Sequence, residues 1–225
     1  MKGCEHMQMA IPPIELREAL HFLGWRGTPV DDQTLDQIQR MMDIVRKEIT
    51  AHVVTSRFGL DADKHLVGTV FATQGTDVYK LLASCDEAIL LAATLGAKSE
   101  RLLLRQQASS SADALIMDAV LSAAIEAVCD ETENQIRRDA EAGGLYLTDR
   151  FSPGYGDMPL VQTREICAVL NAERSIGLSV SGSGIMIPRK SVTAIMGISR
   201  LPQARRPSAC AVCNMRATCA LRGRK

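Results

Sequence analysis

The chain is organised around one loop, whose sequence is Asp149-Arg150-Phe151-Ser152-Pro153-Gly154-Tyr155-Gly156-Asp157-Met158-Pro159. Pro153 fixes its own φ angle and favours an extended residue before it, while Gly154 permits backbone angles that other residues resist. Arg150 carries a planar fork of donors suited to a carboxylate or phosphate, and Tyr155 adds a flat face that ends in a hydroxyl. Such a loop is suited to a small zwitterionic or nucleoside ligand, although an isolated motif of this kind is also typical of an ordinary turn.

Apolar spacing outside this loop predicts both helices and strands. We expect an α+β fold, in which a twisted, mainly antiparallel sheet is packed with helices. Residues 1–13 are expected to be a loose start. Whether the serines at 109–111 break a helix is left open by the pattern. The expected helices are 14–23, 32–50, 77–83, a segment from 97 that ends before Gly143, and 163–172; the expected strands are 51–60 and 66–73 as a hairpin, 88–95, and the apolar runs 185–187 and 192–198 as paired strands.

Composition excludes several classes of function. The 225 residues carry a formal net charge of zero, so the long-range attraction to phosphate that dominates nucleic-acid binding is not expected. The sequence has no apolar run near the roughly 20 residues that a membrane-spanning helix needs, and its start lacks the apolar region of a secretory signal. We therefore expect a cytoplasmic protein that binds neither nucleic acid nor membrane.

The helix before the loop carries Glu126 among alanines at 119, 123 and 127, which would allow close approach by a ligand or a neighbouring strand. Its carboxylate is a candidate partner for a positively charged group, whereas a solvated helix glutamate is the ordinary alternative.

The composition changes sharply after residue 200, where Cys210, Cys213 and Cys219 lie among basic residues. A C-x2-C pair with a third cysteine nearby suits tetrahedral chelation, so zinc and an iron–sulfur cluster are both possible, and free thiols are the alternative. A fourth ligand is not evident, although Cys4 and Cys167 are candidates. An odd total of seven cysteines without an export signal favours thiols or metal ligands over disulfides.

The arginine and glycine-tyrosine pattern of the loop resembles the signature of the activation domain of cobalamin-dependent methionine synthase, which binds S-adenosylmethionine. The segments 91–97 and 125–128 upstream, and 181–184 with 187–188 downstream, are similar to the same domain. Residues 20–27 look more like free-standing relatives than like the carboxyl-terminal domain of the large enzyme. The resemblance divides the chain into residues 1–75 (amino-terminal helices and hairpin, part of the same domain), 76–200 (the activation-domain-like core) and 201–225 (the Cys-rich appendage).

The resemblance implies a free-standing subunit that reactivates a partner by reductive methylation of inactive cob(II)alamin, and that is a component of a methyltransferase without activity of its own. It implies an electron donor such as flavodoxin or ferredoxin. It also implies a ligand site in which Arg150 binds the methionine carboxylate, Glu126 complements positive charge, and Ser152, Gly154 and Tyr155 frame the nucleoside.

One departure from the family pattern concerns a pair of tyrosines after Pro188, where this chain has Val192 and Thr193. One ligand contact of the family is therefore in doubt here. Two alternatives stay open: a reactivator of another corrinoid methyltransferase, and a metal-binding electron-transfer or scaffold subunit that uses the cysteines.

Overall fold

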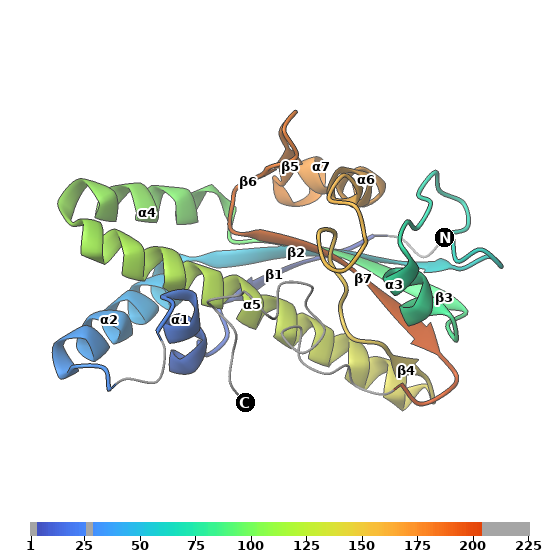
Figure 1. The fold of residues 1–225 in the computed structure, drawn as a ribbon, viewed down its shortest axis with the longest axis horizontal. Helices are drawn as coiled ribbons and strands as arrows, with labels where there is room; N and C mark the ends of the chain where they lie inside the picture. Colours follow the sequence, from blue (N-terminus) through green and yellow to red (C-terminus); the bar gives the residue numbers. More distant parts are fainter. Residues whose placement is uncertain (1–3, 26–28, 204–225) are drawn as a thin grey trace.

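The computed structural model describes residues 4–25 and 29–203, and these residues form a single α+β arrangement of helices around a five-stranded sheet. Figure 1 shows this arrangement as a ribbon. Within the described ranges the helices are α1 (Leu16–Phe22), α2 (Asp32–Glu48), α3 (Thr76–Leu82), α4 (Gly96–Ser109), α5 (Ser111–Ala142), α6 (Gln162–Val169) and α7 (Ala172–Ile176), and the strands are β1 (Glu5–Ala10), β2 (Thr50–Gly59), β3 (Glu87–Thr94), β4 (Tyr146–Leu147), β5 (Ser179–Val180), β6 (Met186–Ile187) and β7 (Ser191–Ser199).

The main sheet has the strand order β1-β2-β3-β7-β4, and all of its neighbouring strands are antiparallel. The predicted fold class is therefore confirmed. Strands β1 and β2, from the first 75 residues, lie in the same sheet as β3 and β7.

Helices cover both faces of this sheet, which explains why β3 is an unbroken apolar run. Alternate side chains of a strand point to opposite faces, so a strand that is covered on both sides needs no polar face. On β3, Ile89 and Leu91 belong to the core beneath α2 and α5, whereas Leu90 and Ala92 belong to the core beneath α3, α6 and α7. In Figure 1, α1, α2 and α5 lie on one side of the sheet, and α6 and α7 lie on the other.

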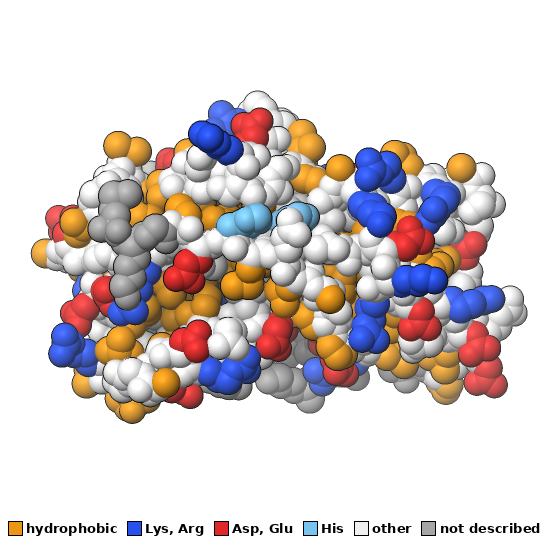
Figure 2. Space-filling model, turned by 180° about the vertical axis from the view of Figure 1, so that it is seen from behind, with side chains coloured by type: hydrophobic (Ala, Val, Ile, Leu, Met, Phe, Trp, Pro, Cys, Tyr) orange, Lys and Arg blue, Asp and Glu red, His pale blue; other side chains and the backbone are white. Residues whose placement is uncertain are grey.

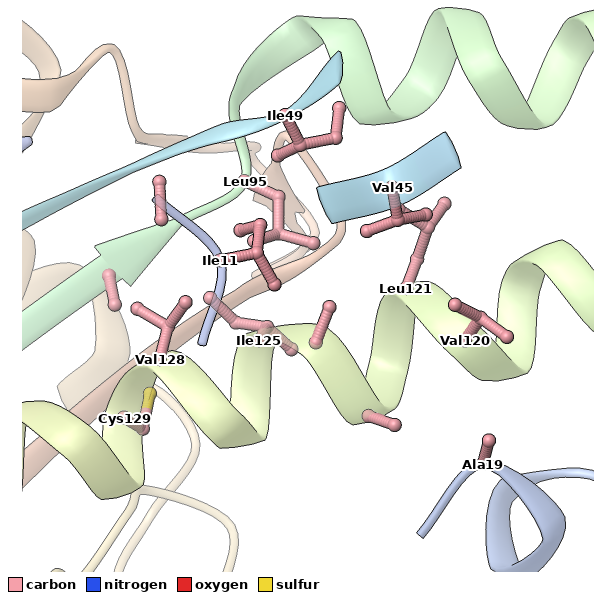
Figure 3. Close-up of a cluster of buried hydrophobic side chains, with 14 of the residues drawn as sticks. Ile11, Ala19, Val45, Ile49, Leu95, Val120, Leu121, Ile125, Val128 and Cys129 are labelled. Atoms are coloured by element: carbon pink, nitrogen blue, oxygen red, sulfur yellow. The ribbon is translucent and has the colours of Figure 1, made fainter. Parts of the chain in front are cut away.

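Helix α5 is the long element that crosses the sheet and carries one side of the candidate site. Its inner face supplies Leu121, Ile125 and Val128 to the larger core. In Figure 3, Ile125 and Val128 lie toward Ile11 and Leu95, and Leu121 points toward Val45. The serines do break the helical run: the Ser110 side chain accepts a hydrogen bond from the Asp113 amide at 3.2 Å and begins α5 as its N-cap.

Residues 5–10, which were expected to be part of a loose start, form β1 and pair with β2 along their whole length. The side chains of β1 are mostly exposed, with Met9 packed against the larger core. A short strand that buries so little shows almost no apolar alternation, and its pairing depends on the tertiary partner.

The predicted hairpin of residues 51–60 with 66–73 is wrong. The two segments share a single bridge, between Leu60 and Leu66, and β2 pairs instead with β1 and β3. Leu66 and Phe71 are buried, so their apolar character serves the second core from a loop rather than from a strand.

The prediction that the apolar runs 185–187 and 192–198 pair with each other as strands is also wrong. Strand β6 pairs with β5 across the turn at 181–184, while β7 pairs with β3 and β4 in the main sheet. Pro188 lies between the runs and has no amide hydrogen with which to continue a ladder. The expected helix at 163–172 ends at Val169, and a short helix, α7, follows from Ala172.

On the face shown in Figure 2, acidic and basic side chains are intermingled rather than gathered into areas of one sign. Among the described residues, no helix combines the length and the apolar character needed to cross a bilayer.

Candidate functional site

Arg150 and Glu126 converge, as the sequence predicted. Arg150 follows β4 and points back to α5, where its Nη1 and Nη2 atoms each lie 3.4 Å from Oε2 of Glu126. The Arg150 side chain is 17% exposed and that of Glu126 is 40% exposed. The ion pair therefore lies at the protein surface with the arginine largely covered.

Two further acids on α5 contact the same arginine, and sequence reasoning missed both. Nη2 of Arg150 donates to Asp130, and Nε donates to Oε2 of Glu133 at 2.9 Å. Residues 126, 130 and 133 are spaced by four and three, which places them on one face of a helix. The helical spacing of these three acids was the sequence signal that could have identified Asp130 and Glu133 as partners of Arg150. We call Glu126, Asp130 and Glu133 the α5 carboxylates.

A second arginine, Arg137, continues the stripe by one more turn. Its Nη2 donates to Oε1 of Glu133 at 2.7 Å and lies 3.3 Å from Oδ1 of Asp149. Two arginines thus face four carboxylates, and the cluster carries an excess of negative charge. That excess favours a ligand with positive charge.

Burial and opposite charge act against each other on these groups. Burial raises the pKa of Glu126 and of Asp130, and the neighbouring Arg150 only partly offsets this effect. Burial alone would lower the pKa of Arg150, but the negative groups around it raise the pKa above the ordinary value. Burial also raises the pKa of the adjacent Cys129 thiol to about 12, so at neutral pH this thiol is uncharged and the carboxylates hold the arginine charged.

The loop after Arg150 has a well-defined backbone. Phe151 is buried and exchanges two backbone hydrogen bonds with Ile195 of β7, each of 2.9 Å. The amide of Tyr155 donates to the Ser152 carbonyl at 3.1 Å, and the amide of Gly154 donates to the Met158 carbonyl at 2.9 Å. Gly154 has a φ of +91°, a region that favours glycine.

The loop places the tyrosine outward. The side chain of Tyr155 is 58% exposed, while Met158 at the far end of the loop is buried. An exposed ring of this kind provides a stacking surface for a planar group. The predicted residues Ser152, Gly154 and Tyr155 thus lie together on one ordered loop that begins at Arg150.

The tip of this loop is fastened to the start of α3. The carboxylate of Asp157 accepts hydrogen bonds from the amides of Thr76, at 2.6 Å, and Asp77, at 3.0 Å. The loop and the start of α3 pack closely, and glycine is needed on each side of the contact. A Cβ atom on Gly75 would lie 2.7 Å from Asp157, and one on Gly156 would lie 2.5 Å from the Asp77 carboxylate. Sequence reasoning missed this contact because it joins segments about eighty residues apart.

The position that departs from the family pattern faces α5. Val192 is partly buried and packs against the larger core, whereas the next residue, Thr193, is buried on the other side of β7. Valine has no hydroxyl, so this position cannot supply a hydrogen bond from a tyrosine hydroxyl to a ligand.

The cysteines of the predicted metal site, Cys210, Cys213 and Cys219, lie outside the described residues. Of the two candidates for a fourth ligand, Cys4 is exposed and Cys167 is buried, with burial raising the pKa of its thiol to about 11. Within residues 4–25 and 29–203, no group of three or more His, Cys, Asp or Glu side chains is arranged to hold a metal ion.

Comparison with known proteins supports the fold but not a sequence family. No family model matches the chain, and no curated protein matches its sequence. Among solved structures, the chain is similar to the crystal structure of the MetH reactivation domain bound to AdoHcy, with a TM-score of 0.63 and 16% sequence identity. The match covers 92% of this chain and 81% of that one. The chain therefore has the fold of the MetH reactivation domain.

Proposed function

We propose that this chain binds S-adenosylmethionine between Arg150 and the loop at 152–158, and acts as a reactivation module for cobalamin-dependent methionine synthase. The observation that carries the proposal is the convergence of Arg150 with Glu126, within the fold of a domain whose solved structure holds AdoHcy. The enzyme activity belongs to the partner, and the chain is a component of it.

The residues suit the chemistry of the ligand. S-adenosylmethionine has one carboxylate and two positive groups, the ammonium and the sulfonium. Arg150 offers a planar pair of donors to the carboxylate, and Glu126 and Asp130 offer negative charge to the positive groups. Tyr155, which is exposed, offers a face to the nucleoside.

Arg150 must exchange partners to bind such a ligand, because its donors already meet the protein's own acids. The bonds to Glu126 are long, at 3.4 Å, and Asp130 is 62% exposed, so both acids can turn to water or to the ligand's positive groups at small cost. In this proposal a ligand carboxylate takes their place on the guanidinium.

The chemistry would reside in the ligand and the partner's cofactor: S-adenosylmethionine would supply the methyl group and leave as S-adenosylhomocysteine, and a donor such as flavodoxin or ferredoxin would supply the one electron that cob(II)alamin needs to become methylcobalamin. The chain's own residues bind and orient. Arg150, Glu126 and Asp130 fix the amino-acid end of the ligand, and the loop fastened to α3 fixes the other end, so that the reactive group is held in one direction.

The test uses an isolated corrinoid partner that lacks reactivating activity of its own. The partner is poised as cob(II)alamin and mixed with S-adenosylmethionine, a low-potential reductant and this chain. The proposal predicts methylcobalamin formation that depends on the chain and is lost with Arg150→Ala. Recovery that is the same without the chain contradicts the proposal for that partner. Success with another corrinoid methyltransferase but not with methionine synthase favours the alternative partner.

The proposed metal site is tested separately. If Cys210, Cys213 and Cys219 hold zinc or an iron–sulfur cluster, protein isolated without oxygen carries the metal, and it loses the metal when these cysteines are replaced by serine. Cys4→Ser and Cys167→Ser then show whether either supplies a fourth thiolate. Protein that carries no metal and cannot be reconstituted contradicts the electron-transfer alternative.

A further inference from the structure

Arg137 ties the end of α5 to the segment that leads into Arg150. Its Nη1 donates to the Leu147 carbonyl at 2.5 Å, and its Nη2 reaches the Thr148 carbonyl at 3.4 Å and Asp149 at 3.3 Å. The side chain of Arg137 is 15% exposed. A single guanidinium thus fastens three consecutive residues to the helix.

Glu133 lies between the two arginines and uses both of its oxygens. Oε1 accepts from Nη2 of Arg137 at 2.7 Å, and Oε2 accepts from Nε of Arg150 at 2.9 Å. Its side chain is also only 15% exposed. Because Arg137 holds one oxygen, the other oxygen has a fixed direction toward Arg150.

The guanidinium of Arg150 therefore has two unlike edges. The Nε edge meets a covered carboxylate that a second arginine holds in place. The Nη1 and Nη2 edge meets Glu126, at 3.4 Å and 40% exposed, and Asp130, which is 62% exposed. Exposed ion pairs of this kind contribute little and exchange readily, whereas covered ones with good geometry persist.

We propose that Glu133, oriented by Arg137, is a positioning residue that presents the Nη1 and Nη2 edge of Arg150 to the carboxylate of the ligand. The inference deepens the proposed function and rests on it. Glu133 does not touch the ligand. It keeps Nε occupied, so that only the edge opposite to it is free to change partners.

The test compares Glu133→Gln with Glu131→Gln. Glu131 is on the same helix but pairs with the exposed Arg138, so its replacement is the matched control. A glutamine at 133 keeps the length of the side chain, but its amide group cannot accept from both arginines. Glu133→Asp is a second variant, which keeps the charge but is too short to span both partners.

The first readout needs no ligand. In the NMR spectrum of the wild-type protein, the Nε–H signal of Arg150, assigned by its loss in Arg150→Lys, should exchange slowly with water. Exchange should be faster in Glu133→Gln and unchanged in Glu131→Gln. An Nε–H that stays equally protected in Glu133→Gln overturns the inference.

The second readout compares the affinities of S-adenosylmethionine and decarboxylated S-adenosylmethionine. The wild-type protein should prefer the carboxylated ligand, and Glu133→Gln should reduce this preference roughly tenfold to a hundredfold, as expected for a hydrogen bond to a charged group. Binding of the decarboxylated ligand should not change, whereas a general loss of structure would weaken both. A preference that survives in both variants at position 133 overturns the inference with the proposed function intact. A wild-type protein that binds neither ligand overturns both.

Discussion

The two ends of the candidate site are built by different means. At the charged end, Arg150 is held by ion pairs with side chains of α5, of which Glu126 is 40% exposed and Asp130 is 62% exposed. At the loop end, residues 151–158 are held by backbone hydrogen bonds, by the buried Phe151 and by the contact of Asp157 with the start of α3. Under the proposed function, the charged end exchanges partners when a ligand binds, while the loop end keeps its shape.

The largest effect should come from the charged end. Arg150→Ala removes a charge-assisted contact but little core volume, so the protein should fold while its affinity for S-adenosylmethionine falls by roughly 2–5 kcal/mol. Equilibrium dialysis measures the affinity. Arg138→Ala removes an exposed arginine from α5 and is the control, since it should bind as the wild-type protein does. Equal affinity in the two variants would place the ligand carboxylate elsewhere.

The loop end should respond to shape rather than to charge. Gly75→Ala places a Cβ atom 2.7 Å from Asp157 at a φ of +114°, so we expect a loss of roughly 1–3 kcal/mol in the free energy of unfolding. Gly68→Ala is the control, because Gly68 also has a positive φ of +79° but nothing within 4 Å of the added atom. Denaturant unfolding that gives the same loss for both variants would show that the close fit is unimportant.

Replacing Asp157 at the same contact tests whether the fastened loop matters for ligand binding as well as for stability. Asp157→Ala removes the acceptor for two amides of α3, with an expected loss of about 0.5–2 kcal/mol in the free energy of unfolding. Asp31→Ala removes the corresponding cap of α2, whose carboxylate accepts from the Thr34 amide at 2.9 Å. Both variants should lose stability, but only Asp157→Ala should also weaken ligand binding. Unchanged affinity in Asp157→Ala would mean that the loop needs no fastening.

The smallest effect concerns pH. Because burial raises the pKa of Glu126 in the folded protein, the unfolded state gives up this proton first as the pH rises. We therefore compare the free energy of unfolding of the wild-type protein with that of Glu126→Gln. The wild-type value should fall relative to the variant as the pH rises from 4.5, the ordinary pKa of glutamate, through the raised pKa of Glu126 in the folded protein. Thermal unfolding across this range measures the difference. A difference that does not vary with pH would contradict the raised pKa.

Much of the fold was readable from sequence because local patterns coincide with the final packing. The helical spacing of α2, the apolar run of β3 and the glycines after α5 each report one element. The errors share one cause, which is that a tertiary partner decided the structure. Strand β1 is defined by pairing with β2, and the apolar residues of 66–73 fill the second core from a loop.

The candidate site was predicted only in part, because some of its contacts join segments that are distant in sequence. Arg150 and Glu126 were found because a resemblance pointed to them, and the loop was found because its turn residues are adjacent in sequence. Asp130 and Glu133 repeat at helical spacing, and that pattern alone could have added them. Asp157 could not have been assigned, because its partners at the start of α3 are distant in sequence and are backbone amides, which any residue carries.

A crystal structure with S-adenosylmethionine bound would show directly whether Arg150 holds the ligand. We expect the ligand carboxylate on the Nη1 and Nη2 atoms of Arg150, Asp130 moved away from the guanidinium, and Nε still donating to Glu133. The loop at 152–158 should keep its backbone. A ligand bound away from Arg150, or an Arg150 that keeps all of its contacts with α5 while the ligand is bound, would contradict the account.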